Sequence, residues 1–306
     1  MILGVLALAG ECAGQAVDAS GAARPALTVP IELEGRRQLV TLDLDGNIVE
    51  RIETAPAPAM EPDWSPDGRR LAFLARINGV GQLFVKDIGS GKVLRLTDTN
   101  TEQQLPTWSP DGSRIVFKSL QEGNNEVCTM KPDGSDVVNL TNNPGFDADA
   151  VWSPDGRQIA FASLRDNQPF RVFVMNADGS GQRPLIQDNL SGWLYPEWSP
   201  DGARIVFGYP GPDGSVQLTF AWVDSGTWWK VTTDRAVNSF ARWSPDGRYV
   251  AYLKVPLPVD MNGWTSELFV YDIEKDEHRR LTSGLAPNQG GRPAWKPVAS
   301  QPRADR

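Results

Sequence analysis

A chain of 306 residues, of which 40% are hydrophobic and 22% charged, has the composition of a globular protein and can bury about 75% of its unfolded surface. Its formal net charge of −8 and its pI near 4.9 argue against nucleic acid or an anionic membrane as a partner, because both require clustered lysines and arginines.

The first residues predict export. Residues 1–9 form an apolar run that is too short to span a membrane but has the length of the hydrophobic part of a signal peptide, although no basic residue precedes it and the first is Arg24. Cys12 suggests a lipid anchor, but Glu11 stands where a lipobox requires a small residue. We therefore predict an export-signal-like leader and flexible segment at 1–26, a periplasmic or otherwise extracytoplasmic location, and a disfavoured lipid anchor.

Three short strands are predicted after the leader. Residues 27–33, 38–43 and 47–52 are rich in β-branched and apolar residues and are separated by turn-forming residues. They match the second, third and fourth strands of the repeat unit that follows them in the chain. The tryptophan-containing first strand of that unit does not precede them.

A pentapeptide, Trp-Ser-Pro-Asp-Gly, then occurs five times. Successive copies are separated by 44, 44, 46 and 45 residues, and they begin at Trp64, Trp108, Trp152, Trp198 and Trp243. In the first unit, Pro66, Asp67 and Gly68 favour a tight hairpin, because proline fixes φ, aspartate bonds the local backbone and glycine accepts a positive φ. Four short strands for each period of about 40 to 45 residues are the signature of propeller blades.

The end of the repeat region closes the ring. Residues 292–297, Arg-Pro-Ala-Trp-Lys-Pro, repeat the first strand of a sixth unit. One C-terminal strand joining the three N-terminal strands completes a blade and removes an open sheet edge. The sequence therefore predicts an all-β fold, a monomeric six-bladed β-propeller of four-stranded antiparallel blades at 27–298, with a disordered tail at 299–306.

The same residues resemble those of a known family. The Trp-Ser-Pro-Asp-Gly repeats, the following Leu-Ala-Phe type strands and the Leu-Thr endings resemble the propeller of TolB and related periplasmic proteins, over about residues 27–298. In TolB the propeller follows a mixed α/β domain and binds the lipoprotein Pal of the Tol-Pal envelope system. Because only residues 1–26 precede the first strand, we expect a propeller alone. The resemblance implies a Pal-like lipoprotein as the partner, without assigning contact residues.

Most enzyme classes lack the residues they need. His278 is the only histidine and lies beside a predicted outer-strand turn, where a solvated role is expected. Related propeller lyases that act on pectin fragments use several histidines around a metal, and no Gly-x-Ser-x-Gly elbow of a serine hydrolase occurs. Asp147 and Asp149 are the nearest approach to a carboxylate cluster, but they lack calcium-loop spacing. We expect no metal, no cofactor and no enzymatic activity.

Candidate partner-binding residues lie on one predicted face. Tight hairpins occupy one face of the propeller, whereas the second-to-third loops and the blade-to-blade loops share the other, the long-loop face. The longest loop, 254–267, carries Met261 and Trp264, and Trp193 and Tyr195 enter the same face. Aromatic residues there can anchor a protein or stack on a sugar, and packing against a neighbouring blade explains the apolar residues of the long loop equally well.

Three charged residues precede a repeat tryptophan directly. Asp63, Glu197 and Arg242 hold this position, and we predict that they line a polar channel mouth. Taken together, the residues favour a non-catalytic protein-binding scaffold. The alternatives are a glycan-binding propeller of the cell envelope and an enzyme that acts on glycans with carboxylates alone.

Overall fold

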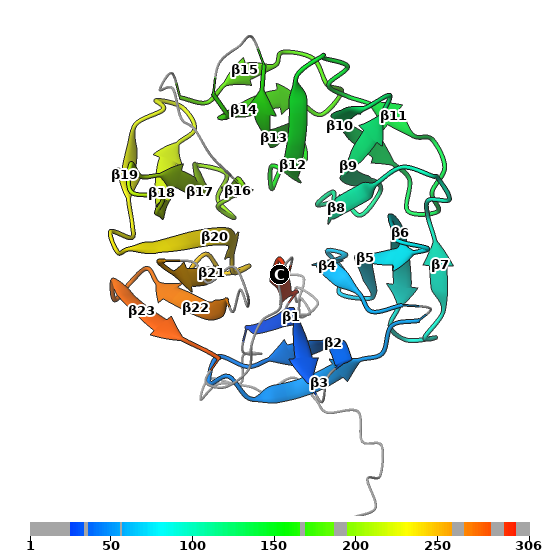
Figure 1. Ribbon diagram of the computed structural model, residues 1–306, viewed down its shortest axis with the longest axis horizontal. Coiled ribbons are helices and arrows are strands. Elements are labelled where there is room, and N and C mark those ends of the chain that lie inside the picture. The colour runs from blue at the N-terminus through cyan, green and yellow to red at the C-terminus, as the bar shows by residue number, and fades with distance from the viewer. Residues whose placement is uncertain are drawn as a thin grey trace, which may run out of the picture.

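The computed structural model describes residues 25–33, 36–55, 57–165, 169–186, 195–258, 266–282 and 291–297. Its strands are arranged as concentric sets around a central axis (Figure 1). The innermost strands are β4 (Met60–Trp64), β8 (Gln103–Trp108), β12 (Phe146–Trp152), β16 (Glu197–Trp198), β20 (Ala236–Trp243) and β24 (Ala294–Lys296). The second strands are β5 (Arg70–Ile77), β9 (Ile115–Gln121), β13 (Gln158–Leu164), β17 (Arg204–Pro210), β21 (Tyr249–Pro256) and β1 (Ala26–Leu33).

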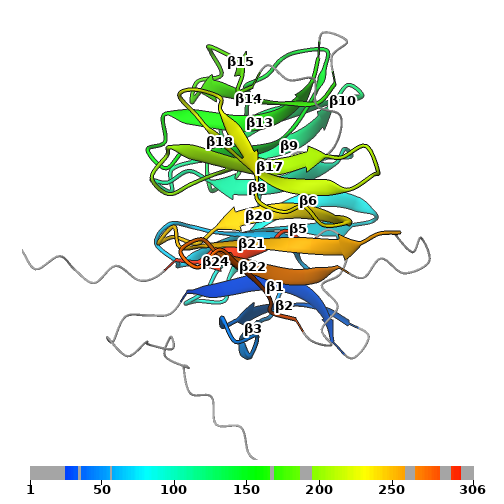
Figure 2. The same ribbon diagram turned by 90° about the vertical axis from the view of Figure 1, so that its left-hand side faces the viewer.

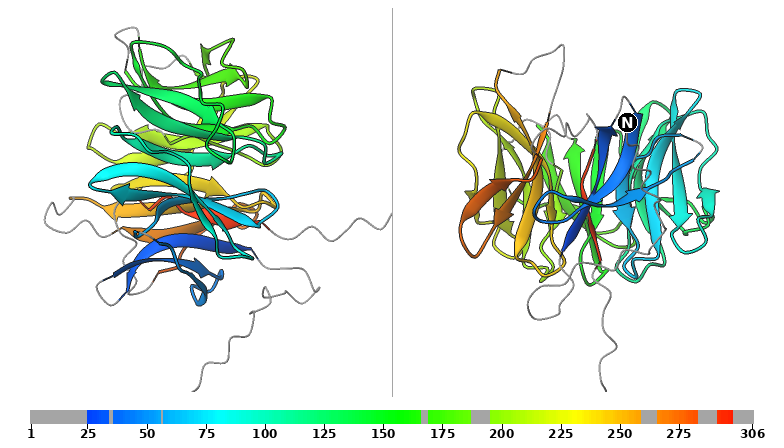
Figure 3. Two further views of the ribbon diagram at one scale, coloured as in Figure 1. Left: turned by 90° about the vertical axis from the view of Figure 1, so that its right-hand side faces the viewer. Right: turned by 90° about the horizontal axis from the view of Figure 1, so that it is seen from below.

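The outer half of each blade is built in the same way. The third strands are β6 (Val80–Asp87), β10 (Asn124–Met130), β14 (Arg171–Asn176), β18 (Val216–Trp222), β22 (Glu267–Asp272) and β2 (Arg36–Leu42). The outermost strands are β7 (Val93–Arg95), β11 (Val138–Asn139), β15 (Arg183–Pro184), β19 (Trp228–Lys230), β23 (Glu277–Arg280) and β3 (Ile48–Ile52). The described strands thus form six antiparallel blades, which confirms the predicted fold class, and Figures 2 and 3 show the ring from its sides.

The predicted closure is confirmed. One blade has the strand order β24-β1-β2-β3, and Leu27 pairs with Trp295 across it. The Trp64 indole N–H donates to Thr28 Oγ1 at 2.9 Å, and Lys296 Nζ lies 2.8 Å from Glu50 Oε2. Segments from the two ends of the sequence therefore hold one blade together. The blades β16–β19 and β20–β23 share one further parallel pair, between β18 and β20.

Each Trp-Ser-Pro-Asp-Gly segment ends an innermost strand and turns into the second. In the first copy, Ser65 Oγ donates to Asp67 Oδ1 at 2.6 Å and accepts the Arg70 N–H at 2.9 Å. The Gly68 N–H reaches the Ser65 carbonyl at 2.8 Å with φ at +67°, a backbone conformation that favours glycine. The pentapeptide thus forms a tight hairpin turn between the first and second strands, as predicted. The repeat tryptophans are buried and pack between blades.

Apolar residues fill the interfaces between blades. Each of the six hydrophobic clusters draws its residues from two neighbouring blades, so every blade covers its two faces with its neighbours. Cys128 is fully buried in one of these clusters, as expected for a small apolar residue. In the part of the chain that the structure describes, no helix is long and apolar enough to cross a membrane. The predicted leader and tail lie outside the described residues, except for Pro25 and Ala26.

A candidate binding site in the central channel

A backbone bulge interrupts the innermost strands just before the tryptophan. In β4, β8, β12 and β20 the pairing register shifts by one residue, for example between Met60 and Asp63. The residue three positions before the tryptophan has a positive φ in five blades: Glu61, Leu105, Asp149, Tyr195 and Phe240, with φ between 41° and 57°. This conformation costs a residue other than glycine about 1–2 kcal/mol. Strained bulges of this kind cluster at functional sites and aim side chains there.

Two rings of side chains follow from this arrangement. The bulge ring is the set three residues before each tryptophan: Glu61, Leu105, Asp149, Tyr195, Phe240 and Arg292. The flanking ring is the set directly before it: Asp63, Thr107, Val151, Glu197, Arg242 and Ala294. A cavity of about 290 Å³ is lined by five members of the flanking ring and by prolines of the tight turns. The channel is therefore lined by charged side chains. These side chains differ from blade to blade, whereas the residues of the Trp-Ser-Pro-Asp-Gly turns are the same in five blades.

Ion pairs tie the flanking ring together across the axis and connect it to Arg292 of the bulge ring. Arg242 Nη2 donates to Asp63 Oδ1, and Arg242 Nη1 lies 3.5 Å from Glu197 Oε2. Arg292 reaches the same Glu197 oxygen at 3.1 Å and donates to Thr107 Oγ1 at 3.2 Å. Burial opposes the charged form of Arg242, but the carboxylates of Glu197 and Asp63 outweigh it and raise the Arg242 pKa. The three predicted residues Asp63, Glu197 and Arg242 thus come together in one network.

The bulge ring contains a second group of acids. Burial raises the pKa of Glu61 to about 7 and that of Asp149 to about 6, although Lys118 and Arg292 lower both. Glu61 accepts the Leu105 backbone N–H at 2.7 Å. Among the described residues no group donates a hydrogen bond to the Asp149 carboxylate, although only 8% of this residue is exposed. The charge of Asp149 is compensated only through Lys118 and Arg292, without a hydrogen bond, so Asp149 marks a place where a ligand group is favoured.

An aromatic pair completes the bulge ring. The Tyr195 and Phe240 rings have centroids 4.0 Å apart and are tilted by 33°. Burial and the charges of Asp149 and Glu61 raise the Tyr195 pKa well above its usual range, so the phenol stays neutral. The ring thus combines an apolar platform with buried charges of both signs.

The aromatic and apolar residues predicted from the sequence have two different outcomes. Tyr195 belongs to the bulge ring and stacks on a residue that sequence analysis missed, Phe240. Trp193, Met261 and Trp264 lie outside the described residues. The missed members of the ring had a signal in the sequence, because they occupy the position three residues before each repeat tryptophan.

The carboxylates singled out in the sequence do not act together. Two oxygens of Asp147 each accept a 2.7 Å bond from Arg165 inside a blade, whereas Asp149 belongs to the bulge ring. His278 is exposed on the outermost strand β23, and its Nδ1 lies 3.0 Å from the Tyr252 hydroxyl oxygen. Within the described ranges no group of three or more His, Cys, Asp and Glu side chains is placed to hold a metal ion.

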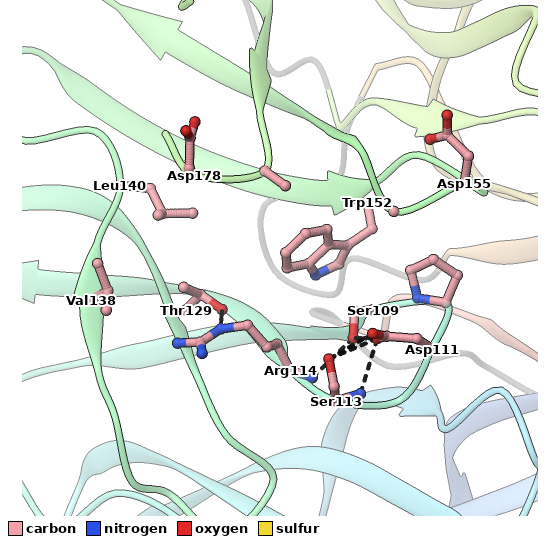
Figure 4. A pocket seen from close by; sticks show the side chains of 13 residues that line it. Ser109, Asp111, Ser113, Arg114, Thr129, Val138, Leu140, Trp152, Asp155 and Asp178 are labelled. Carbon is pink, nitrogen blue, oxygen red and sulfur yellow. Dashed lines mark hydrogen bonds between the residues drawn. The ribbon is translucent and has the colours of Figure 1, made fainter. Parts of the chain in front are cut away.

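A larger hollow lies between two blades on the tight-turn side. It has a volume of about 570 Å³ and is lined mainly by turn residues of β8–β11 and β12–β15 (Figure 4). Several of its polar groups have partners, since Asp111 accepts from Ser109 and Ser113 and Arg114 donates to Thr129 Oγ1 at 3.0 Å. The buried indole N–H of Trp152 has no hydrogen-bond partner among the described residues. This hollow is a consequence of the repeated hairpins, and the charged side chains named above are held by residues of the turns themselves.

The ring of six blades with a charged axis defines a closed β-propeller of the kind that presents binding surfaces. Residues 30–207, more than half of the chain, match the family model of the TolB beta propeller domain, and the chain belongs to that family.

Solved structures share this fold. TolB from Acinetobacter baumannii superposes with a TM-score of 0.72 at 21% identity, over 89% of this chain and 67% of that one. A putative TolB from Agrobacterium tumefaciens gives 0.69 at 19% identity, over 89% and 98%. An oligogalacturonate lyase in complex with manganese gives 0.53 at 16% identity, over 85% and 73%. At these identities the likeness concerns the fold alone.

Proposed function

We propose that this propeller is a non-catalytic, extracytoplasmic protein-docking scaffold and that its partner binds at the bulge-ring end of the channel. The observation that carries the proposal is the bulge ring itself. Five of its six residues hold a strained backbone that glycine would adopt freely, yet none of the five is a glycine. The strained conformation recurs in five blades, but the side chains that it presents differ. We expect this combination where the side chains contact a partner.

The chain direction indicates which face is involved. Each innermost strand runs from the blade-connecting segments toward its tight turn, so the bulge ring lies nearer the long-loop face than the flanking ring does. The long-loop face is also the predicted interface. The family membership supports a role like that of the TolB propeller, with a Pal-like lipoprotein as the partner and the periplasm as the location.

The hydrogen bonds of the carboxylates Glu61 and Asp63 support a binding role rather than a catalytic one. Glu61 accepts the backbone N–H of Leu105, and Asp63 accepts that of Trp108 at 2.8 Å. Both carboxylates of β4 therefore anchor the neighbouring strand β8. A group committed to the backbone of the next blade is poorly placed to transfer protons to a substrate.

One observation favours the alternatives. The Tyr195–Phe240 pair is a surface on which a sugar ring can stack, and the raised pKa values of Glu61 and Asp149 suit a general acid. A glycan-binding propeller, or an enzyme that acts on glycans with carboxylates alone, would use the same ring. The experiment must therefore separate a protein partner from a glycan.

The test is calorimetric titration of the wild-type propeller with the purified Pal-like lipoprotein of the same organism, beside a glycan array. We expect protein binding, weakened about tenfold or more by Tyr195→Ala, because interface aromatics often act as hot spots. Trp222→Ala is the matched control, since Trp222 is 40% exposed on the outer part of a blade. A glycan signal that is lost in Tyr195→Ala, without any binding to the lipoprotein, would overturn the proposal.

A further inference from the structure

A basic groove lies on the outer rim, away from the channel. It has a volume of about 890 Å³ and lies between the closing blade (β24-β1-β2-β3) and the blade β4–β7. The outermost strands of these two blades, β3 and β7, are seen at the rim of Figure 1. Arg36 and Arg37 of β2, Arg51 of β3 and Lys86 of β6 line it. Glu53 is the one acidic residue among the described residues that line the groove. A concentration of four cations is unexpected in a chain whose net charge is −8.

These cations lack ion-pair partners in the described part of the chain. Among the described residues, none of the four forms an ion pair; Arg37 donates to Met60 Sδ at 2.6 Å, and Lys86 reaches the Gly91 carbonyl at 3.5 Å. Other arginines of the protein are paired, as Arg76 is with Glu102 and Arg114 is with Asp136. Like charges gathered without counterions repel each other, and a bound anion would remove that repulsion.

The lining restricts the class of anion. No aromatic side chain lines the groove within the described ranges, so a sugar or a nucleobase has no ring to stack on. The groove is concave, unlike the surface that a bilayer requires. Ile52, Pro58 and Val93 lie beside the cations and provide apolar contacts.

Two strand edges complete the recognition surface. In the described sheets β3 pairs only with β2 and β7 pairs only with β6, so the outer edge of each strand has no strand beside it. An extended peptide can add to such an edge through its backbone while its side chains enter the adjacent groove. Charge and edge geometry together match an extended polypeptide with acidic and apolar residues.

We propose that this groove binds an extended acidic segment of a partner protein, at a site separate from the channel. The cations attract the acidic side chains, the apolar lining accepts the side chains between them, and the open strand edges orient the segment. Association is therefore expected to weaken as salt screens the charges.

The test measures binding of a fluorescein-labelled peptide of alternating glutamate and valine residues by fluorescence anisotropy. We expect binding that falls with added salt and that weakens about tenfold or more in the double variant Arg36→Glu, Arg51→Glu. The control variant Arg157→Glu, Arg183→Glu makes the same change in net charge at exposed arginines of another blade. It should keep the wild-type affinity within about twofold, because charge at a distance is screened.

Three outcomes would overturn the proposal: an equal loss in the control variant, absence of peptide binding at low salt, or tighter binding of an anionic oligosaccharide or of phosphatidylserine vesicles than of the peptide. The variant Arg36→Gln, Arg51→Gln, checked with the others by circular dichroism, repeats the test if charge reversal impairs folding. Channel binding serves as an internal reference. If the groove variants lose the peptide but keep the lipoprotein, the two sites are independent.

Discussion

Two buried carboxylates show how differently one functional group is accommodated. Asp147 is fully buried and receives two bonds from Arg165, whose guanidinium also stacks on Phe173. Glu61 has a single backbone donor and a pKa of about 7. The first carboxylate is built into the blade as one half of an ion pair, whereas the second is kept in the channel with its charge poorly compensated. The second carboxylate instead anchors the neighbouring strand β8 and keeps a raised pKa.

The raised Glu61 pKa predicts a pH dependence of stability. Its folded-state pKa of about 7 exceeds the usual 4.5, so the unfolded state releases the proton first and stability falls as pH rises between these values. Between about pH 5 and pH 7, this group should lower the unfolding free energy of the wild type by up to about 2 kcal/mol, and Glu61→Gln should abolish that decrease. Urea titrations at several pH values measure it.

The exposed Asp133 provides the control for this prediction. Its pKa is lowered by hydrogen bonds from Ser135, so its titration lies below the tested window. Asp133→Asn should therefore retain the wild-type slope of stability against pH. If Glu61→Gln also retains that slope, the carboxylate is not desolvated in the way described.

Neighbouring blades meet at the turns between third and outermost strands. Gly134, in the β10–β11 turn, has φ at +86°, and a Cβ there would lie 2.5 Å from the Leu96 carbonyl oxygen of the preceding blade. Gly179 is placed in the same way against Leu140, at 2.7 Å. These leucines begin the Leu-Thr endings, and Thr97 Oγ1 accepts the Leu83 N–H at 2.9 Å to fix that segment. At these turns, neighbouring blades therefore contact each other through their backbones.

This close approach can be separated from backbone strain. Gly79 has φ at +85°, and a Cβ added there would meet no described atom within 4 Å, so Gly79→Ala should cost only the strain, about 1 kcal/mol. Gly134→Ala adds a clash with a rigid carbonyl, and we expect a total loss of about 3 kcal/mol. Guanidinium unfolding of both variants measures the difference. Equal losses would show that the blades adjust at no cost.

At the scale of the molecule, ring closure depends on three residues of β24. They pair with Ala26, Leu27 and Thr28, and the Trp295 indole N–H donates to the Arg242 carbonyl at 2.8 Å. Trp295 is 6% exposed and belongs to the cluster between the closing blade and its neighbour. Closure therefore contributes both a strand pairing and a buried aromatic side chain.

Removing the closing strand should lower stability sharply. A chain that ends after Arg292 lacks β24, and loss of a buried tryptophan alone costs about 3–5 kcal/mol, which corresponds to roughly 5–9 °C in Tm for a domain of this size. A chain that ends after Pro297 keeps the strand and serves as the control. Differential scanning calorimetry compares them, and an unchanged Tm in the shorter chain would contradict the closure described here.

The sequence was sufficient for the blades but not for the channel. The spacing of Trp64, Trp108 and their equivalents predicts blade number and closure, because the repeated residues make hairpins that must recur. The bulge ring was missed because its residues differ in type and because only strand pairing reveals the register shift. Asp147 and Asp149 illustrate this point, since the bulge between Ala148 and Val151 separates two carboxylates that regular alternation would keep on one face.

The pairing of β1 with β24 also fixes an order of events during synthesis. β1 is the first strand of the propeller to be translated, and the segment that covers its edge is translated after all the other strands. Until then the nascent chain carries an uncovered sheet edge that intermolecular pairing can use. The pairing of β24 with β1 is therefore the last one that synthesis makes possible among the described strands, and a chaperone that shields β1 would protect the chain until then.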